Sequence, residues 1–362
     1  MTKKIVLKDV ARKAGVSYQT VSKVIRNQIQ VSPEVRERVY AAIEELGYHP
    51  NAAAQNLRTR ASRLIGYSWQ QDRQYQFSSV LQEFQHSVVE SAEDLGYHVL
   101  LFPQRHNRDL NTMYAEHVRT GRIDGFILSS VEYNDPRIPI IEALGVPAVC
   151  FGRADGDMPL PYVDVDGRAG IVTAVNHLIA QGHRRIAVLA WPETSRVGSE
   201  RLAGYVDAMA AAGLEIDPRW LVRGAGETDY GYTAARELLA LPEQRRPTAI
   251  VTLLDVIAIG AMRAVEDCGL RVGCDVAVTG FDDMPIIQYL KPGLTSLRQP
   301  VWQVGQRVVD LLVTLLQGET PPVRHIMLKP ELIIRESSQG FVPDDAAPAS
   351  GLAAGLDEVN MR

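Results

Sequence analysis

Three things are scarce in this chain of 362 residues, and each scarcity argues against a class of protein. Only three cysteines occur, Cys150, Cys268 and Cys274, and none forms a CxxC pair, so the pattern favours reduced thiols over a disulfide framework. No apolar run is long enough to cross a membrane. The start of the chain has no apolar export segment. We therefore expect a cytoplasmic protein without a membrane partner.

Motifs of catalysis and of metal binding are also missing. The sequence contains no GxSxG, GxxxxGKS/T, HExxH or GxGxxG pattern. Gly224 and Gly226 are not followed by the third glycine that a dinucleotide loop requires. His177 and His183 have a spacing that does not suit a metal pair on one helix face. We expect no enzyme activity, no metal and no cofactor.

Acidic residues are scarce at the start of the chain. Residues 1–60 hold 11 Lys and Arg against 5 Asp and Glu, a net charge of +6, whereas the other 302 residues carry −11. The whole-chain charge of −5 therefore conceals a basic head on an acidic body. A basic head provides salt-dependent contacts to phosphates, and an acidic body discourages wrapping by DNA.

The basic head contains a predicted pair of short helices, in the stretch KDVARKAGVSYQTVSKVIRN. Apolar residues at helical spacing predict a helix over Leu7–Ala14, and Gly15 permits the left-handed exit from it. Ser17 fits the N-cap of a second helix. That helix would bury Val21, Val24 and Ile25 and leave its polar side chains outward.

A third helix is predicted from Ser32-Pro33-Glu34, a helix-opening pattern, to about Leu46, before Gly47. One interpretation is a plain three-helix bundle whose charged residues are only solvated. The charge contrast instead favours a helix-turn-helix, in which the second helix enters the major groove of DNA.

Beyond these local patterns, the chain resembles the LacI/GalR family of bacterial transcription regulators. The resemblance rests on DVARKAGVSYQTVSKVIRN and VSPEVRERVYAAIEELGYHPNAAAQNLRTRASRLIG, and it covers roughly residues 5–338. It implies a homodimer on a pseudo-palindromic, double-stranded operator. The implied domains are a helix-turn-helix headpiece (1–49), a hinge helix or linker (50–61), an effector-binding and dimerisation domain (62–338) and a disordered tail (339–362).

The same resemblance implies which residues contact DNA. Tyr18 and Gln19 match the base-reading positions of the lactose-type variant, whereas Lys23 and Arg26 depart from it and leave the operator sequence open. Leu57 matches a linker leucine that wedges into the minor groove, although it could also be an apolar residue packed in a plain linker. The predicted DNA-binding residues are Ser17, Tyr18, Gln19, Thr20, Ser22, Lys23, Arg26, Asn51, Ala54 and Leu57.

The body alternates strand-like runs with amphipathic helices. Strands are expected over 63–69, 97–102, 125–130, 147–152, 185–191, 248–254 and 276–281, and helices over segments such as 79–95, 170–181 and 255–268. This alternation predicts parallel sheets covered by helices on both faces. The resemblance implies an α/β body with two parallel-sheet subdomains, like a type I periplasmic binding protein. The expected crossings lie near 161–167, 291–296 and 322–328, so the N-subdomain is 62–163 plus 294–323 and the C-subdomain 164–293 plus 324–338.

Open α/β sheets bind ligands at the carboxyl ends of their strands. Acidic, guanidinium and aromatic side chains gather at these ends in the sequence, a chemistry that suits the hydroxyls and C–H face of a sugar. The strand-end rule and the resemblance together predict the effector-binding residues Trp69, Phe77, Arg153, Trp191, Arg201, Asp255, Asp282 and Gln299. Each one taken alone could instead form an ion pair or pack in the core, and a purine-type ligand is the alternative chemistry.

The sequence thus predicts a transcriptional repressor whose operator affinity is switched by a sugar or glycoside bound between two hinged subdomains. It would act in the bacterial cytoplasm, on the nucleoid when bound to its operator. A solute-binding protein on the same fold would need an export segment, and a sugar-acting enzyme would need a phosphate-binding loop. Whether the ligand induces or corepresses is not readable from the sequence.

Overall fold

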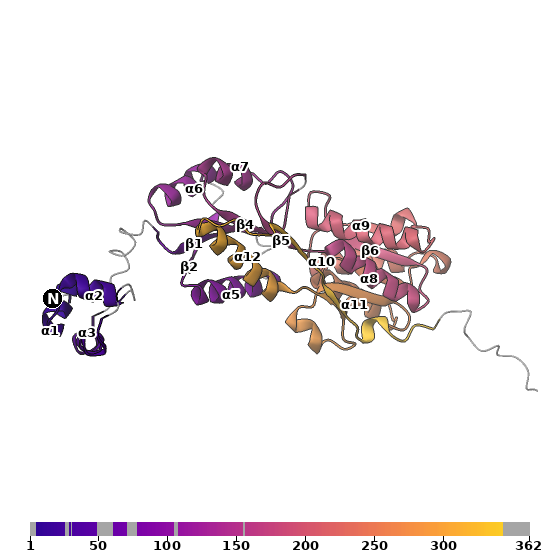
Figure 1. Cartoon of the computed structure of the whole chain (residues 1–362). Coiled ribbons are helices and arrows are strands. Elements are labelled where there is room, and N and C mark those ends of the chain that lie inside the picture. Colours follow the sequence, from indigo (N-terminus) through magenta and orange to yellow (C-terminus); the bar gives the residue numbers. More distant parts are fainter. Residues whose placement is uncertain are drawn as a thin grey trace, which may run out of the picture. The chain divides into compact units, whose positions relative to one another are not determined.

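The structure is a computed structural model that describes residues 5–25, 29, 31–48, 61–70, 78–104, 108–154 and 156–342. The chain divides into two units, Met1–Ser62 and Arg63–Arg362, and each is considered by itself (Figure 1). The predictions made for Arg26, Asn51, Ala54, Leu57, Phe77 and the tail beyond residue 342 lie outside the described residues. Within the described ranges, no helix is both long and apolar enough to cross a bilayer.

The first unit holds three short helices around a small apolar core. They are α1 (Leu7–Ala14), α2 (Tyr18–Ile25) and α3 (Pro33–Leu46). The bounds of α1 and α3 and the start of α2 are those that the local signals predict. Gly15 and Gly47 end α1 and α3 in left-handed conformations, with φ of 66° and 59°. Val10, Val21 and Val39 are fully buried between the helices, so the polar side of α2 faces outward.

One predicted cap differs from the structure. Ser32 occupies the N-cap position of α3, but its hydroxyl does not accept from the helix backbone. The hydroxyl instead hydrogen-bonds the Glu34 carboxylate and lowers the pKa of that group. Ser17, by contrast, caps α2 as expected, because its Oγ accepts from the Thr20 backbone N–H at 3.0 Å.

The second unit is built on two six-stranded sheets. The N-subdomain sheet has the order β11-β5-β4-β3-β1-β2, and the C-subdomain sheet has the order β12-β10-β9-β8-β6-β7. The strands are β1 (Leu64–Gln70), β2 (His98–Gln104), β3 (Gly125–Leu128), β4 (Ala148–Phe151), β5 (Tyr162–Val165), β6 (Ile186–Ala190), β7 (Leu221–Arg223), β8 (Ala249–Thr252), β9 (Ala277–Asp282), β10 (Thr295–Arg298), β11 (His325–Leu328) and β12 (Glu331–Ile333). Among the described strands, only the β10–β12 pair is antiparallel.

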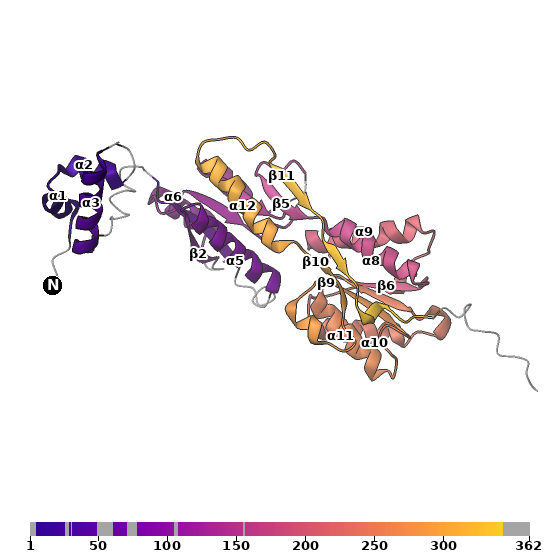
Figure 2. The same ribbon diagram turned by 60° about the horizontal axis from the view of Figure 1, so that its bottom comes forward.

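Helices cover both faces of each sheet, which gives two three-layered subdomains (Figures 1 and 2). The helices are α5 (Ser79–Asp94), α6 (Leu110–Arg119), α7 (Arg137–Leu144), α8 (Gly167–Ala180), α9 (Arg196–Ala211), α10 (Thr228–Leu239), α11 (Asp255–Asp267) and α12 (Val301–Leu316), with short turns η2 (Pro218–Trp220), η3 (Glu243–Arg245), η4 (Pro285–Tyr289) and η5 (Glu336–Ser338). Helices α5 and α12 pack on one face of the N-subdomain sheet, and α6 and α7 pack on the other. In the C-subdomain, α8 and α9 oppose α10 and α11.

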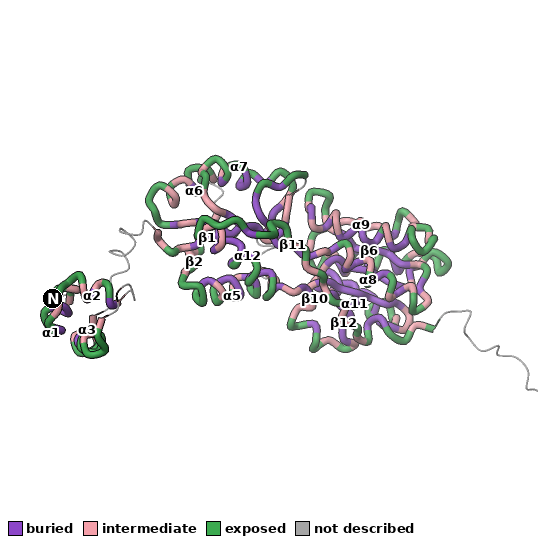
Figure 3. The backbone as a smooth tube through the Cα atoms, viewed as in Figure 1, coloured by how far each residue is buried: buried purple, intermediate pink, exposed green. Residues whose placement is uncertain are grey.

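The central strands are buried on both faces, as Figure 3 shows by their purple colour. Every residue of β3, β6 and β8 is buried, which is why these segments are continuous apolar runs instead of alternating ones. Burial of each large aliphatic or aromatic side chain contributes about 1.5–3 kcal/mol to stability. Burial also raises the pKa of Cys150 to about 12, so this thiol stays protonated, and all three cysteines are free.

Two of the expected crossings between the subdomains lie elsewhere. Strand β10 pairs with β9 and β12, so residues 295–298 belong to the C-subdomain, although the sequence assigned them to the N-subdomain. Strand β11 pairs with β5, so residues 325–328 belong to the N-subdomain, as Figure 2 shows. The chain therefore crosses after β5, after β10 and after β11. A short strand takes its place from its pairing partners, and the partner of the edge strand β11 is distant in the sequence, which local patterns do not reveal.

Candidate functional site

The outward face of α2 is the first candidate site. Ser17, Gln19 and Lys23 are exposed, and so is Tyr18, whose exposed fraction is 51%. Thr20 and Ser22 are half-buried, and the Thr20 hydroxyl lies 2.8 Å from Ser17 Oγ. The sequence predicted all six as DNA contacts, and the structure brings them onto α2 and its N-cap.

The buried side of α2 holds this face in place. Val21 and Val24 are fully buried against α1 and α3, and Lys13 on α1 pairs with Glu45 on α3 at 2.5 Å. A helix anchored in this way presents its polar side chains to a groove without first having to fold.

The second candidate site is a cleft between the two subdomains, with a cavity volume of about 910 Å³. It lies at the carboxyl ends of the parallel strands, where open α/β sheets bind ligands. Phe151 and Asp164 line it from the N-subdomain, and Trp191 and Asp282 line it from the C-subdomain. Four of the predicted effector residues line this cleft: Trp191, Arg201, Asp282 and Gln299.

Arg201, Asp282 and Gln299 form the polar centre of the cleft. Gln299 Nε2 donates to Asp282 Oδ1 at 2.7 Å, and Arg201 Nη2 lies 3.8 Å from the same oxygen. Arg201 Nη1 donates to the Leu253 carbonyl at 2.7 Å, and its guanidinium lies 3.5 Å from the centre of the Phe281 ring. Arg201 Nε and Trp191 Nε1 are buried without a hydrogen-bond partner in the described chain. Such donors suit the oxygen atoms of a ligand.

The backbone at Asp282 is strained, and its carboxyl group is tuned by burial. Asp282 has φ of 117° and Asp283 has φ of 51°, values that non-glycine residues seldom adopt and that cost about 1–3 kcal/mol each. Ion pairs from Asp283 to Arg298 and Arg335, at 2.6 and 2.7 Å, hold this turn. Burial raises the pKa of Asp282 to about 6, and Arg201 partly opposes the shift.

Asp255 does not line the cleft, contrary to the sequence prediction. It is fully buried behind the lining, where its carboxylate accepts from Ser296 Oγ at 2.6 Å and from the Met284 backbone N–H at 2.7 Å. Burial and the neighbouring Asp282 raise its pKa well above the usual value. Leu254, the preceding residue, lines the cleft instead. Asp255 therefore supports the loop after β9, and its side chain is a positioning group.

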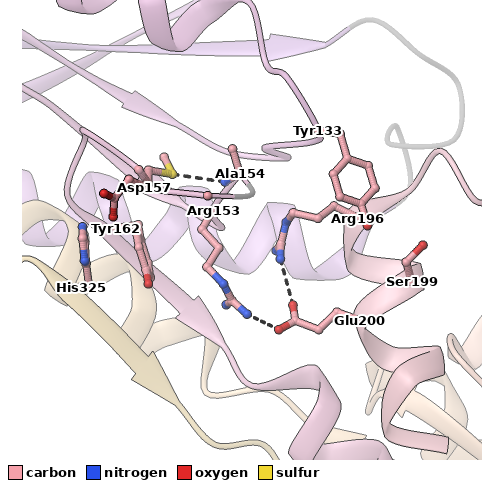
Figure 4. A pocket seen from close by; sticks show the side chains of 11 residues that line it. Tyr133, Arg153, Ala154, Asp157, Tyr162, Arg196, Ser199, Glu200 and His325 are labelled. Carbon is pink, nitrogen blue, oxygen red and sulfur yellow. Dashed lines mark hydrogen bonds and ion pairs between the residues drawn. The ribbon is translucent and has the colours of Figure 1, made fainter. Parts of the chain in front are cut away.

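Trp69 and Arg153 lie beside the cleft instead of in it. Trp69 lines a separate cavity of about 510 Å³ within the N-subdomain. Arg153 lines a third cavity, of about 540 Å³, together with Arg196 and Glu200 from α9 (Figure 4). Trp69 lies at the carboxyl end of β1 and Arg153 follows β4, as the sequence predicted, but the end of a strand alone does not specify which cavity a side chain enters.

Arg153, Asp164, Arg196 and Glu200 make up an inter-subdomain ion-pair cluster. Arg153 Nη1 lies 2.5 Å from Asp164 Oδ2, and Arg196 lies 3.1 Å from Asp164 and 2.9 Å from Glu200. Arg153 also pairs with Glu200, so that both guanidinium groups point at this carboxylate (Figure 4). Because Arg153 and Asp164 belong to the N-subdomain and the other two to α9, the cluster forms only while the subdomains are close.

Several lining residues were missed from the sequence. Glu132, after β3, accepts from the Arg196 backbone N–H at 2.6 Å and so meets the N-terminus of α9 across the cleft. Gly224 and Gly226 also line the cleft, and a Cβ on Gly226 would lie 2.7 Å from Trp191 Nε1. The local spacing of these glycines carries no sign of the packing of Trp191 against Gly226, because the two segments are far apart in the sequence. No three His, Cys, Asp or Glu side chains in the described ranges could hold a metal ion.

Comparisons with known proteins identify the family of the chain. A family model described as "Bacterial regulatory proteins, lacI family" matches residues 6–51, and a "Periplasmic binding protein-like domain" model matches residues 175–338. The chain is 37% identical over 343 residues to the HTH-type transcriptional regulator CelR of Thermobifida fusca, covering 91% of this chain and 97% of that one. The chain belongs to the lacI family.

Two solved lacI-family structures share the fold along nearly the whole chain. The transcriptional regulator CelR–cellobiose complex is 34% identical, with a TM-score of 0.69, and covers 92% of this chain and 99% of its own. The lac repressor dimer bound to operator and the anti-inducer ONPF is 31% identical, with a TM-score of 0.79, covering 93% and 100%. These matches confirm the expected fold class. As a lacI-family member, this chain is a DNA-binding regulator of transcription, and the relatives named here are regulators, not enzymes.

Proposed function

We propose that this lacI-family regulator represses transcription as a homodimer on operator DNA, and that a carbohydrate bound in the cleft switches its operator affinity. The observation that carries the proposal is that one cleft is lined by both subdomains and centred on Arg201, Asp282 and Gln299. It would act in the bacterial cytoplasm, on the nucleoid when bound to DNA. The relative CelR, solved with cellobiose, supports the ligand class.

The chemistry of the cleft suits a polyhydroxylated ring. A carboxylate, a guanidinium and an amide side by side can donate to and accept from neighbouring hydroxyls. The aromatic faces of Trp191 and Phe151 can cover the C–H surface of the ring. Polar groups that converge within a mostly apolar cleft are typical of small-molecule sites.

The switch follows from the position of the cleft. A ligand held by Asp282 on one side and by N-subdomain residues on the other has a higher affinity for one relative arrangement of the subdomains. The effect on DNA binding cannot exceed this difference in affinity between the two arrangements.

In the headpiece, we assign Tyr18, Gln19 and Lys23 to the major groove on the basis of their exposure on α2.

Exposed apolar side chains support the homodimer. Tyr289 and Ile286 on η4 have exposed fractions of 75% and 54%, and Leu101 on β2 has 47%. Association with a second copy of the chain would remove these apolar side chains from water. A two-fold dimer would place two α2 helices to read a pseudo-palindromic operator.

The test has two steps. A thermal-shift screen with glucose, galactose, cellobiose, maltose and lactose identifies ligands, and an operator titration is then repeated with each sugar that stabilises the protein. We expect at least one sugar to raise the Tm and to change the operator Kd. Stabilising sugars that all leave operator affinity unchanged would refute the switch.

Arg201→Ala tests the assignment of the cleft. The variant loses a charged donor, so we expect sugar affinity to fall by about 100-fold, since hydrogen bonds to charged groups contribute about 1.5–3 kcal/mol. Operator binding without sugar should be retained, which shows that the variant is folded. An unchanged thermal shift with the sugar would exclude Arg201 from the site.

A further inference from the structure

The cleft does not end at the wall of the N-subdomain. The cavity of about 510 Å³ that contains Trp69 shares three lining residues with the cleft: Ser78, Leu81 and Ser130. Two cavities with common lining residues meet at those residues. We name this second cavity the annex.

The lining of the annex differs from that of the cleft in charge. The cleft holds Arg201 and Asp282, whereas no charged side chain is found among the described residues that line the annex. Trp69, Gln82 and Gln85 provide an indole ring and two side-chain amides there. Among the described lining residues, a phosphate or a carboxylate would find no counter-charge, whereas a neutral hydroxylated ring would find both a flat face and hydrogen-bonding partners.

The floor of the annex is held rigid by its own hydrogen bonds. Tyr67 Oη lies 2.7 Å from Ser129 Oγ, and Ser68 Oγ lies 2.6 Å from Tyr114 Oη, all of them buried. Trp69 lies two residues after Tyr67 on β1, on the same face of the sheet. Its ring is only partly covered, with an exposed fraction of 37%, so an apolar surface is available at the edge of a preformed cavity.

We propose that the annex is a second sugar subsite, so that the effector is a neutral oligosaccharide of at least two units. One unit lies on Arg201 and Asp282 in the cleft, and the next stacks on Trp69 in the annex. This inference rests on the carbohydrate function proposed above. The size of the cleft agrees with it, because about 910 Å³ is already near the upper end of the roughly 300–1,000 Å³ that small-molecule sites occupy.

The test compares how sugar length affects binding in matched tryptophan variants. Calorimetry on the full chain would measure glucose, cellobiose and cellotriose, with maltose and maltotriose in parallel, for the wild type, Trp69→Ala and Trp302→Ala. Trp302 is the control, because it is 38% exposed on α12 and lines none of the three cavities. We expect a disaccharide to bind more tightly than glucose. Trp69→Ala should reduce this ratio of affinities about tenfold, and Trp302→Ala should leave it unchanged.

The possible results separate the annex from the function on which it rests. If Trp69→Phe restores most of the affinity ratio of disaccharide to glucose, the result supports stacking, because phenylalanine again provides an aromatic ring at this position. If the affinity ratio of disaccharide to glucose is the same in the wild type and in Trp69→Ala, the annex is overturned while the carbohydrate effector stands. If sedimentation shows that Trp69→Ala dissociates the dimer while the affinity ratio of disaccharide to glucose is unchanged, Trp69 belongs to a subunit interface. That result would also overturn the annex. If none of the sugars binds, both proposals fail.

Discussion

Asp282 shows how a single residue acquires a function from its surroundings. Its position at the end of β9 directs the carboxyl group toward the cleft, and its strained φ of 117° is maintained by the ion pairs of the neighbouring Asp283. Burial strengthens a hydrogen bond to this carboxylate. Burial also disfavours the charged form of the carboxyl group, which raises its pKa to about 6.

Sugar binding should therefore depend on pH. The ionised carboxylate accepts hydroxyl donors and attracts Arg201, and protonation removes both effects, so affinity is lost as the pH falls through about 6. With one coupled proton, we expect about tenfold weaker binding at pH 5 than at pH 7, measured by calorimetry. Asp282→Asn should bind more weakly at every pH and lack this dependence. A wild type with equal affinity at both values would contradict the assignment.

At the scale of elements, α9 is the part of the C-subdomain that meets the N-subdomain through charges. Arg196 and Glu200 lie one turn apart on it and reach Asp164 and Arg153 across the cleft. Buried charges of this kind add little net stability, but they cost several kcal/mol if one partner is removed, so they favour one arrangement over others. The cluster therefore suits a role in setting how the subdomains close.

Arg153→Gln should change the coupling between sugar binding and operator binding more than it changes the stability of the fold. Glu200 and Asp164 keep Arg196 as a partner in this variant, whereas the contact of Arg153 with α9 is lost. We expect the ratio of operator Kd values with and without sugar to change by about 5-fold or more, within the usual range of allosteric coupling. Arg168→Gln is the control, because Arg168 pairs with Asp207 inside the C-subdomain. Equal ratios in both variants would exclude the cluster from the switch.

At the scale of the whole molecule, the two units carry separate tasks. The headpiece presents a DNA-reading helix, and the body holds the ligand cleft and the exposed apolar surface on η4 and β2. A repressor that reads a palindrome needs two headpieces, so association of the bodies is a condition for tight DNA binding.

Tyr289→Asp should weaken that association. A charge in an apolar interface must be desolvated, so the dimer should dissociate at concentrations at which the wild type stays intact, as sedimentation velocity would show. Operator affinity should fall in parallel at nanomolar protein. Val323→Asp is the control for the added charge, since Val323 is 54% exposed and precedes β11 of the N-subdomain, outside η4 and β2. A wild type that sediments as a monomer would refute the homodimer.

The parts of this protein that the sequence predicted well are those with local causes. Helices α1 and α3 end and α2 begins where predicted, because Gly15, Gly47 and Ser17 act on their own backbone neighbours. Strands β10 and β11 were assigned to the wrong subdomains, because a strand's subdomain depends on its pairing partners, and β11 pairs with β5, which is far away in the chain.

The amino-acid sequence by itself determined the helix-turn-helix, the alternation of strands and helices, and the set of acidic, basic and aromatic residues from which a sugar site can be built. Only the tertiary structure decided how these residues divide: Asp282 lines the cleft and Asp255 lies behind it, Trp69 enters the annex, and Arg153 joins the ion-pair cluster. The physical reason is that a side chain's type is a local property. Its burial, its partners and the pKa of its ionisable group depend on segments that meet only when the chain folds.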